Sequence, residues 1–441
     1  MIAASKLQRT PFRTSRLLDF CSRKELIAQT GHQPTAWPLV VLKELVDNAL
    51  DACEDAGVPP SVTITADRNG IRVRDNGPGL PPEVVDGVLD FSVRVSSREA
   101  YVAPDRGAQG NALKTILAMP FVLDGDLGRI DVEARGRRHE ITMRVDRLRQ
   151  QPILERNQLS VDPQVGTKIG VWWPDSASSI LESAKARFLQ IATDYTFINP
   201  HLTLAVDWFG EAVQMEATDS QWKKWLPSDP TCPHWYGPEH FERLVTAYIA
   251  HDLESGRRRT VRELVAEFRG LSSTAKQKAV LDEVGLSRTS LADLAVDDLS
   301  QPRLVQGLLK AMQRHTKTVK PVLLGPVGKE HLYARFKHLG CEMESFNHRQ
   351  LTGETDGVPW IVEAAFGWCP GLTGRRLVTG VNWSPGIVNP FRELGKSGRG
   401  LDAVLERQRA GRGEPVCVFL HLICPRVEYT DRGKSAVVVS D

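Results

Sequence analysis

Three short motifs in the first 115 residues carry side chains that suit one kind of chemistry. The segment 44–52 reads ELVDNALDA, the segment 75–79 reads DNGPG, and the segment 107–115 reads GAQGNALKT. The first offers a carboxylate and an amide, the second a carboxylate followed by glycines, and the third glycines followed by a lysine. Each pattern alone arises by chance, but the three in this order and spacing indicate a site for a nucleoside triphosphate.

The first motif lies in a predicted amphipathic helix over residues 38–56, because apolar residues recur there at helical spacing before Gly57. Glu44, Asn48 and Asp51 are four and then three residues apart, so they project from one stripe of this helix. Asn48 is predicted to bind magnesium, which takes hard oxygen ligands and needs only one or two from the protein. Glu44 is predicted to polarise a water in line with the γ-phosphate as a general base, and Asp51 to support the helix or orient water. A solvated polar face is the alternative, but it does not explain an amide in the middle of the stripe.

The second motif follows a predicted β-hairpin. Residues 61–65 and 71–74 alternate in polarity and flank an Asn-Gly turn, which predicts two antiparallel strands. Asp75, at the end of the second strand, suits acceptance of a hydrogen bond from the adenine amino group. Gly77 and Gly79 let the backbone approach the base closely. A tight turn with an incidental aspartate would be the better interpretation if this motif stood alone.

The third motif opens a predicted helix over residues 111–119. Backbone N–H groups at the start of a helix bind phosphate oxygens, and Lys114 adds positive charge on the first turn. The predicted phosphate-binding residues are Gly107, Gln109, Gly110, Asn111, Ala112 and Lys114.

Two further segments are predicted to contact the nucleotide. Thr167 follows Gly166 at the head of a predicted strand and can offer its hydroxyl to the adenine or to its water. The segment 92–105 is polar and irregular, as expected of a lid over the nucleotide. Its Ser96 and Ser97 are candidate nucleotide-binding residues.

The composition excludes several other classes of protein. A chain of 441 residues exceeds what one hydrophobic core usually covers, so about two or three domains are expected. The net charge of +2 gives no strongly basic field, so any DNA contact must be local. Seven cysteines without a CxxC pair fit a reducing compartment and argue against structural zinc, and most are expected to be buried as small hydrophobic residues. The longest apolar run, 416–424, is far too short to span a membrane, so the chain is expected to be soluble.

Basic side chains gather in three segments. The first sixteen residues carry four of them and no acidic residue, which could imitate a transit peptide, although a flexible arm that packs on a partner is the preferred interpretation. The other two clusters fit either a solvated surface or a patch for DNA backbone phosphates. They comprise Arg257, Arg258, Arg259, Arg262, Arg269, Lys276, Lys278 and Arg288 in one segment, and Lys396, Arg399, Arg407, Arg409 and Arg412 in the other.

The three motifs resemble those of the GHKL superfamily, whose Bergerat nucleotide fold occurs in gyrase-type and topoisomerase VI-type ATPases, MutL, Hsp90 chaperones and sensor histidine kinases. Sensor kinases need a phosphoacceptor-histidine hairpin before the ATP domain, and the roughly forty residues that precede the helix do not have that layout. Further stretches resemble the B subunit of topoisomerase VI, a type IIB topoisomerase. They are 15–26, 198–204 with its Asn-Pro-His sequence, the helical block 241–299, and the segments 324–332, 360–367 and 421–429.

This resemblance implies an α+β protein in three parts. Residues 1–218 would form a Bergerat-fold ATPase sandwich with an N-terminal arm. Residues 219–305 would form a linker and a helix-two-turn-helix-like helical insert, in which Gly270 and Gly285 break helices. Residues 306–441 would form an α/β transducer domain. The family continues into a long stalk helix that grips the DNA-cleaving subunit, and this sequence is expected to lack that stalk.

The resemblance also implies roles for single residues. Glu44 becomes the water-activating base, Asn48 the magnesium ligand and Asp75 the adenine anchor, while Lys114 joins the phosphate loop. A transducer lysine of the family senses the γ-phosphate, and Arg426 stands at that place here. Arg426 can still bind a phosphate, as a planar fork rather than a point charge. Lys434 is a second candidate for the same role.

The resulting hypothesis is the ATP-binding and ATP-hydrolysing subunit of a type IIB topoisomerase-like assembly. ATP with Mg²⁺ would drive homodimerisation and close the protein around double-stranded DNA for a separate topoisomerase VI A-type cleaving subunit, with no membrane contact. A cytoplasmic, nucleoid-associated location would follow. The alternative is a stand-alone ATP-gated DNA clamp or scaffold in defence or repair, similar to MutL in role, that performs no strand passage.

Overall fold

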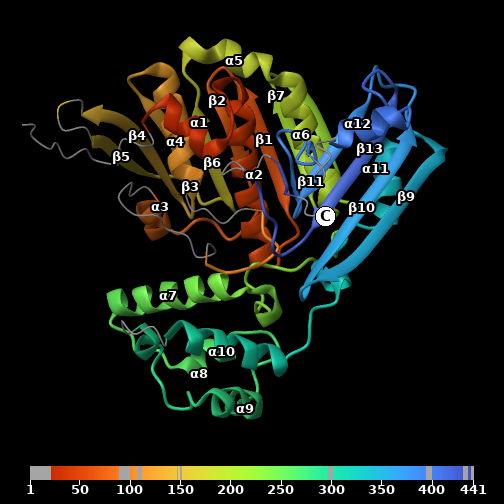
Figure 1. Ribbon diagram of the computed structural model, residues 1–441. Helices are drawn as coiled ribbons and strands as arrows, with labels where there is room; N and C mark the ends of the chain where they lie inside the picture. Colours follow the sequence, from red (N-terminus) through yellow and green to blue (C-terminus); the bar gives the residue numbers. More distant parts are fainter. Residues whose placement is uncertain are drawn as a thin grey trace, which may run out of the picture.

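The computed structural model describes residues 21–88, 100–106, 112–146, 148, 151–295, 301–393, 400–430 and 436–438. Within these ranges the chain forms an eight-stranded sheet with helices, a helical part, and a five-stranded sheet (Figure 1). Helices and strands mix without regular alternation, so the predicted α+β class is confirmed. The boundaries at residues 218 and 305 stay a prediction.

The first part begins with two helices and a hairpin. Its helices are α1 (Arg23–Thr30), α2 (Trp37–Asp55), α3 (Pro82–Val88), α4 (Ala112–Asp124), α5 (Ser178–Ser183) and α6 (Lys185–Ile198). Its strands are β1 (Ser61–Asp67), β2 (Gly70–Arg74), β3 (Gly128–Ala134), β4 (Arg137–Asp146), β5 (Gln151–Ser160), β6 (Thr167–Trp172), β7 (Thr203–Trp208) and β8 (Glu211–Met215). The predicted helix over 38–56 and the predicted hairpin before Asp75 are both confirmed.

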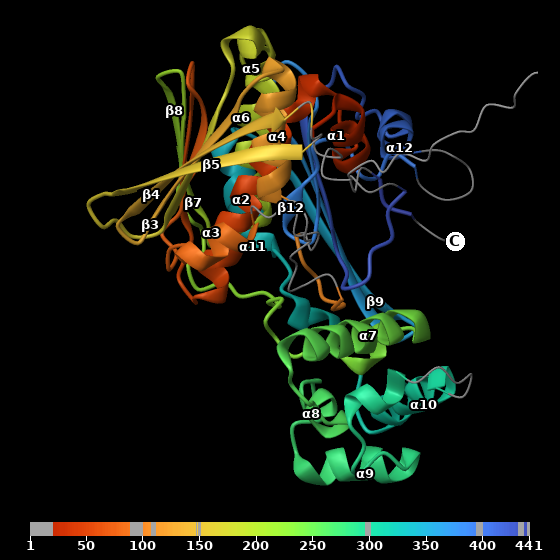
Figure 2. The same ribbon diagram turned by 90° about the vertical axis from the view of Figure 1, so that its left-hand side faces the viewer.

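The eight strands have the order β5-β4-β3-β6-β2-β1-β7-β8. All neighbours are antiparallel except β1 and β7, which run parallel and are joined by a long crossover that contains β2 to β6. Helices α2, α4 and α6 cover one face of this sheet (Figure 2). The apolar side of α2, with Val41, Leu42, Leu45 and Val46, is buried in the core beneath it. Helix α2 therefore lies over the middle of the sheet, against strand β2.

The helical part contains α7 (Pro238–Ser255), α8 (Val261–Ala266), α9 (Thr274–Val284) and α10 (Gln301–Arg314). Gly285 ends α9 in a left-handed conformation with φ 71°, and Gly270, with φ 83°, turns the chain between α8 and α9. Both predicted helix breaks are confirmed. In the segment that leads into α7, Trp225 and Trp235 are buried with ring centroids 4.8 Å apart, so this linker packs onto its neighbours as predicted.

The last part contains α11 (Lys329–His338), α12 (Leu401–Arg407) and the strands β9 (Glu342–Thr355), β10 (Val358–Trp368), β11 (Arg376–Val381), β12 (Ser384–Pro385) and β13 (Val416–Ile423). The strand order is β12-β11-β13-β10-β9, and β11 runs parallel to β13. One continuous core joins this sheet to the helical part, so the two pack as a unit. None of the helices in the described ranges is both long and apolar enough to cross a membrane.

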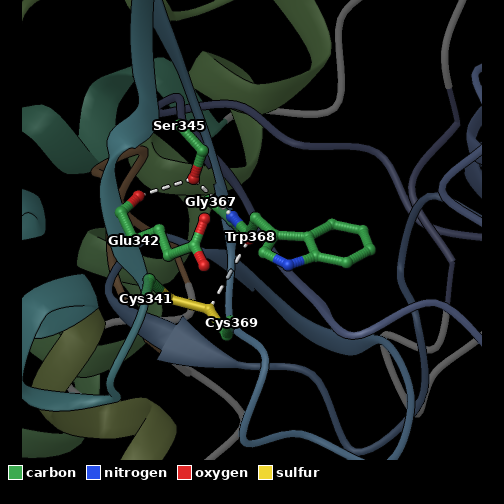
Figure 3. The surroundings of a disulfide bond; sticks show 6 residues. All are labelled: Cys341, Glu342, Ser345, Gly367, Trp368 and Cys369. Carbon is green, nitrogen blue, oxygen red and sulfur yellow. Dashed lines mark hydrogen bonds between the residues drawn. A yellow bond between two sulfur atoms is a disulfide. The ribbon is translucent and has the colours of Figure 1, made fainter.

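A disulfide joins Cys341, just before β9, to Cys369, just after β10 (Figure 3). Register explains the pairing, because Trp368 lies opposite Glu342 and the next positions on both strands are the two cysteines. Most cysteines were predicted to be buried as small hydrophobic residues, and Cys53, Cys232 and Cys417 are buried and outside any disulfide. A separation of 28 residues without a motif gives no sign of a bond that only the hairpin register creates.

Candidate functional site

Asp75 lies at the end of β2 and is held by the backbone around it. Its Oδ1 atom accepts hydrogen bonds from the N–H of Gly77 at 2.8 Å and of Thr167 at 3.1 Å. Its Oδ2 atom accepts no hydrogen bond from the residues that the structure describes. Burial raises the pKa of this carboxyl above its ordinary value, although the two N–H donors oppose that shift. Two backbone N–H groups thus hold one carboxylate oxygen of Asp75, and the other oxygen has the capacity to accept a further hydrogen bond.

Glycines are required where the chain passes closest to Asp75. Gly166 has φ +85°, and a Cβ there would lie 1.8 Å from the carbonyl oxygen of Asp75. A Cβ on Gly77 would lie 3.0 Å from the Oδ1 atom of Asp75 and 3.5 Å from the backbone nitrogen of Cys53. Gly79, with φ +78°, packs under Arg135. The second motif thus lies directly against the end of helix α2, which carries the first motif.

Thr167 contacts this loop rather than standing apart from it. Its backbone N–H and carbonyl both bond to Asp75, and its Oγ1 atom accepts a hydrogen bond from the N–H of Leu80 at 3.0 Å. The threonine therefore ties strand β6 to the segment 75–80. Its predicted contact with adenine stays a prediction, but its place beside the predicted adenine anchor fits that role.

The three residues of the predicted stripe on helix α2 differ in their burial. Asn48 is exposed and Glu44 half-buried, one turn apart, whereas Asp51 is buried. The Oδ1 atom of Asp51 accepts a hydrogen bond from Arg106 at 2.6 Å. The structure therefore gives Asp51 a supporting contact, whereas Asn48 is exposed and Glu44 keeps part of its surface accessible. An amide oxygen at Asn48 fits the hard-oxygen preference of magnesium.

The third motif is described only in part. Helix α4 begins at Ala112 and contacts α2, so Lys114 stands in its first turn as predicted. The Lys114 side chain is only 1% exposed, so the protein encloses this charge. The remaining predicted nucleotide contacts lie outside the described residues: Ser96, Ser97, Gly107, Gln109, Gly110 and Asn111.

Arg426 follows β13 and lies at the start of helix α7. Its Nη1 atom is 3.8 Å from the position that a Cβ on Gly237 would take. The pKa of His240 is lowered mainly by burial, and the positive charge of Arg426 lowers it further. The residues that the structure describes give its guanidinium no hydrogen bond or ion pair. Its predicted role as a γ-phosphate sensor stays a prediction, and Lys434 lies outside the described residues.

The basic cluster in the helical part is only partly available to a phosphate. Arg259 is buried, pairs with Asp252 and Glu267, and lies 4.0 Å from the ring centroid of Tyr248. This arginine supports the fold, so including it in a phosphate patch was wrong. The exposed members of the cluster include Lys276, Lys278 and Arg288, and in the second cluster Arg407, Arg409 and Arg412 are exposed while Lys396 and Arg399 lie outside the described residues.

Sequence reasoning missed a buried charge network around Arg106. This guanidinium binds both oxygens of Glu54 at 2.6 Å and the Oδ1 atom of Asn199 at 2.6 Å, in addition to its bond with Asp51. Burial alone would raise the pKa of Glu54, but Arg106 and Lys224 outweigh it and hold that pKa well below its ordinary value. Two features of the sequence could have indicated this network: Arg106 directly precedes the predicted phosphate loop, and the segment 199–201 has an Asn-Pro-His sequence without a predicted chemical role.

Known proteins are similar to this chain over most of its length. The profile of the family described as histidine kinase-, DNA gyrase B-, and HSP90-like ATPase matches residues 36–174. The B subunit of type 2 DNA topoisomerase 6 from Archaeoglobus fulgidus is 23% identical over 420 residues, which cover 90% of this chain and 66% of the relative. The corresponding protein of Methanosarcina barkeri is 22% identical over 428 residues, which cover 90% and 64%. The chain thus spans just under two thirds of the length of these relatives.

A crystal structure of the N-terminal domain of a DNA repair protein aligns with 94% of this chain and 92% of its own, at 10% identity and a TM-score of 0.39. The matched family segment begins just before helix α2 and ends just after strand β6, so it contains Glu44, Asp75, Lys114 and Thr167. Residues 36–174 therefore form a GHKL ATPase domain with the Bergerat fold, within a chain that is similar along nine tenths of its length to the B subunit of type 2 DNA topoisomerase 6.

Proposed function

We propose that this chain binds and hydrolyses ATP, and that ATP binding closes a homodimer around double-stranded DNA for a separate topoisomerase VI A-type cleaving subunit. The observation that carries the ATP part is the geometry at Asp75. One oxygen is fixed by two N–H groups and the other is left to a ligand, next to the end of the helix that presents Glu44 and Asn48. The DNA and partner parts rest on the similarity to the B subunit of topoisomerase 6 along the chain.

In the proposed site the adenine amino group donates a hydrogen bond to the Oδ2 atom of Asp75. Glu44 takes a proton from the water that attacks the γ-phosphorus, and the bond from that phosphorus to the β,γ-bridging oxygen breaks as ADP leaves. The half-buried position of Glu44 keeps a carboxylate near the surface of the domain, where a water can reach it. Asn48 would hold Mg²⁺, which offsets the charge that develops on the phosphates.

Lys114 fits the phosphate end of this site. An enclosed lysine at the start of a helix adds its charge to the positive end of the helix dipole, and both favour a phosphate. The exposed basic residues Lys276, Lys278 and Arg288 of the helical part are candidates for contact with DNA backbone phosphates.

Asp75→Asn is expected to weaken ATP binding by about tenfold or more. The two backbone N–H groups will hold the asparagine oxygen, so its NH₂ group turns toward the adenine amino group and donor meets donor. Titration calorimetry with a nonhydrolysable ATP analogue measures the change. The control is Asp67→Asn at the end of β1, which should bind as the unchanged chain does. An unaltered affinity in Asp75→Asn would place the adenine contact elsewhere.

Relaxation of supercoiled plasmid tests the proposal as a whole. The chain is assayed with Mg²⁺ and ATP, alone and with a topoisomerase VI A-type subunit. Relaxation, or double-strand breaks, only when both proteins and ATP are present would support the topoisomerase function. ATP-dependent retention of DNA without a change in linking number would contradict strand passage and support the clamp. A chain without ATPase activity under either condition would contradict the proposal entirely.

A further inference from the structure

A tight turn of the five-stranded sheet contacts helix α2, which carries the proposed catalytic residue Glu44. The turn between β11 and β12 contains Asn382 and Trp383, both in the left-handed region with φ 47° and φ 64°. Residues other than glycine seldom adopt this conformation, and they do so where the surrounding structure holds them in it. Two bonds between the Asn382 side chain and the backbone of Cys424, both 2.9 Å, hold the turn at its base.

Ser384, which follows Trp383 and begins β12, contacts helix α2. Its Oγ atom lies 2.8 Å from both oxygens of Asp47, a buried carboxylate one position before Asn48 and three after Glu44. Two groups of the first part also bind this carboxylate: the hydroxyl of Tyr195 at 2.8 Å and the ammonium of Lys43 at 2.8 Å. Asp47 is therefore fully engaged, and Ser384 is its link to the other sheet.

The backbone of Trp383 provides a second link. Its carbonyl oxygen accepts hydrogen bonds from Arg106 at 3.2 Å and from the side chain of Asn199 at 3.0 Å. Arg106 directly precedes the predicted phosphate loop and also holds Asp51 and Glu54 on α2. The turn thus contacts helix α2, which carries the first motif, and Arg106, which directly precedes the third motif.

The same turn is anchored deep in the five-stranded sheet. The N–H of Trp383 donates to the Nε2 atom of His421 on β13 at 3.3 Å, and its indole N–H donates to the carbonyl of Gly325 at 3.2 Å. The ammonium of Lys224 lies 4.4 Å from the centroid of the indole ring. A displacement of α2 cannot leave this turn in place without breaking hydrogen bonds, and those of Asp47 with Ser384, of Trp383 with Arg106, and of Trp383 with Asn199 are buried.

We propose that the turn 382–384 is a latch through which the five-stranded sheet and the nucleotide site position each other, with Ser384 and Arg106 as positioning residues. The latch rests on the proposed ATPase function. Nucleotide binding at Glu44 and Asn48 moves helix α2, Asp47 carries that movement to Ser384, and strands β11 and β13 respond. In the reverse direction, a partner or DNA that shifts the sheet alters the position of the catalytic helix.

The variant Ser384→Ala distinguishes a latch that responds to nucleotide from a purely structural contact. Tyr195 and Lys43 still satisfy Asp47 in that variant, so the chain should fold and bind nucleotide. Hydrogen exchange of amides 381–385 is measured with and without a nonhydrolysable ATP analogue and Mg²⁺. We expect the analogue to slow exchange in the unchanged chain by about fivefold or more, in line with ordinary coupling between sites. In Ser384→Ala this response should be lost, and kcat should fall while the analogue still binds.

Tyr195→Phe is the matched control, because it removes a hydrogen bond to the same carboxylate from helix α6 and leaves the turn in contact. It should keep the response to the analogue. A structural contact would raise exchange in Ser384→Ala without nucleotide yet leave the response intact, which would overturn the latch. An unchanged kcat together with an intact response would overturn it as well. A chain that does not bind the analogue at all would contradict the proposed function and the latch together, which sets that outcome apart from failure of the latch alone.

Discussion

Glu44→Ala is expected to lower the rate of ATP hydrolysis by about 10²- to 10⁴-fold, the usual contribution of a positioned general base. The affinity for ATP should stay near that of the unchanged chain, because the proposed adenine contact is made by Asp75 and the phosphate contacts by the third motif. ATP-dependent dimers should also persist, since binding rather than hydrolysis is proposed to close the dimer. Steady-state release of phosphate and sedimentation with ATP measure the two quantities separately.

The matched control for this variant is Asp55→Ala, an exposed carboxylate near the end of the same helix. It should hydrolyse ATP at the rate of the unchanged chain. If Glu44→Ala were fully active, Glu44 would not be the base. If Glu44→Ala instead lost affinity and kept its turnover at saturating ATP, the residue would serve binding rather than the chemical step.

Arg106→Met is expected to destabilise the protein more than any other single change considered, by about 3–5 kcal/mol. Methionine fills much of the same space but removes the buried guanidinium that pairs with Asp51 and Glu54, and Lys224, 2.9 Å from Glu54, then offsets only part of this buried negative charge. The free energy of unfolding is measured by urea titration. Arg72→Met is the control, because the pair of Arg72 with Asp67 is partly exposed to solvent and should change stability by no more than about 1 kcal/mol.

The loss in Arg106→Met should depend on pH with a definite sign. In the unchanged chain the pKa of Glu54 is held well below its ordinary value, so its contribution to stability is present above the ordinary carboxyl pKa and is lost only as pH falls through the lowered one. Without Arg106 the Glu54 carboxylate takes up a proton at higher pH, and protonation relieves the cost of burying its charge. The difference in stability between the two chains should therefore shrink as pH falls. A difference that is constant with pH would mean that lost packing, not stranded charge, causes the destabilisation.

A double-mutant cycle sharpens this result. Glu54→Gln in the Arg106→Met background should cost much less than the sum of the two single changes, because the removed charge no longer needs a partner. Additive losses would show that Arg106 and Glu54 act independently, in contradiction to their paired 2.6 Å hydrogen bonds.

Local sequence determined the elements of the nucleotide site. Helical spacing of apolar residues fixed α2, an Asn-Gly turn between alternating strands fixed the hairpin before Asp75, and glycines marked the close passage of the chain at Gly77 and Gly79. These features depend on neighbours within a few residues, where backbone sterics and periodicity are decisive. The same locality explains why Gly270 and Gly285 were recognised as helix breaks.

Tertiary structure alone decided which charges are buried together. Arg106, Glu54, Asn199 and Lys224 are far apart in the sequence, and nothing in their spacing shows that they share one enclosed network. Arg259 was predicted to belong to a basic surface cluster, but the packing of other elements gives it buried partners, and the partner that Asp51 finds in Arg106 could not be read from the sequence. The pairing of Cys341 with Cys369 and the contact of Ser384 with Asp47 likewise follow from register and docking. Such contacts depend on which distant segments of the chain pack together. Residue type and local periodicity do not reveal that packing.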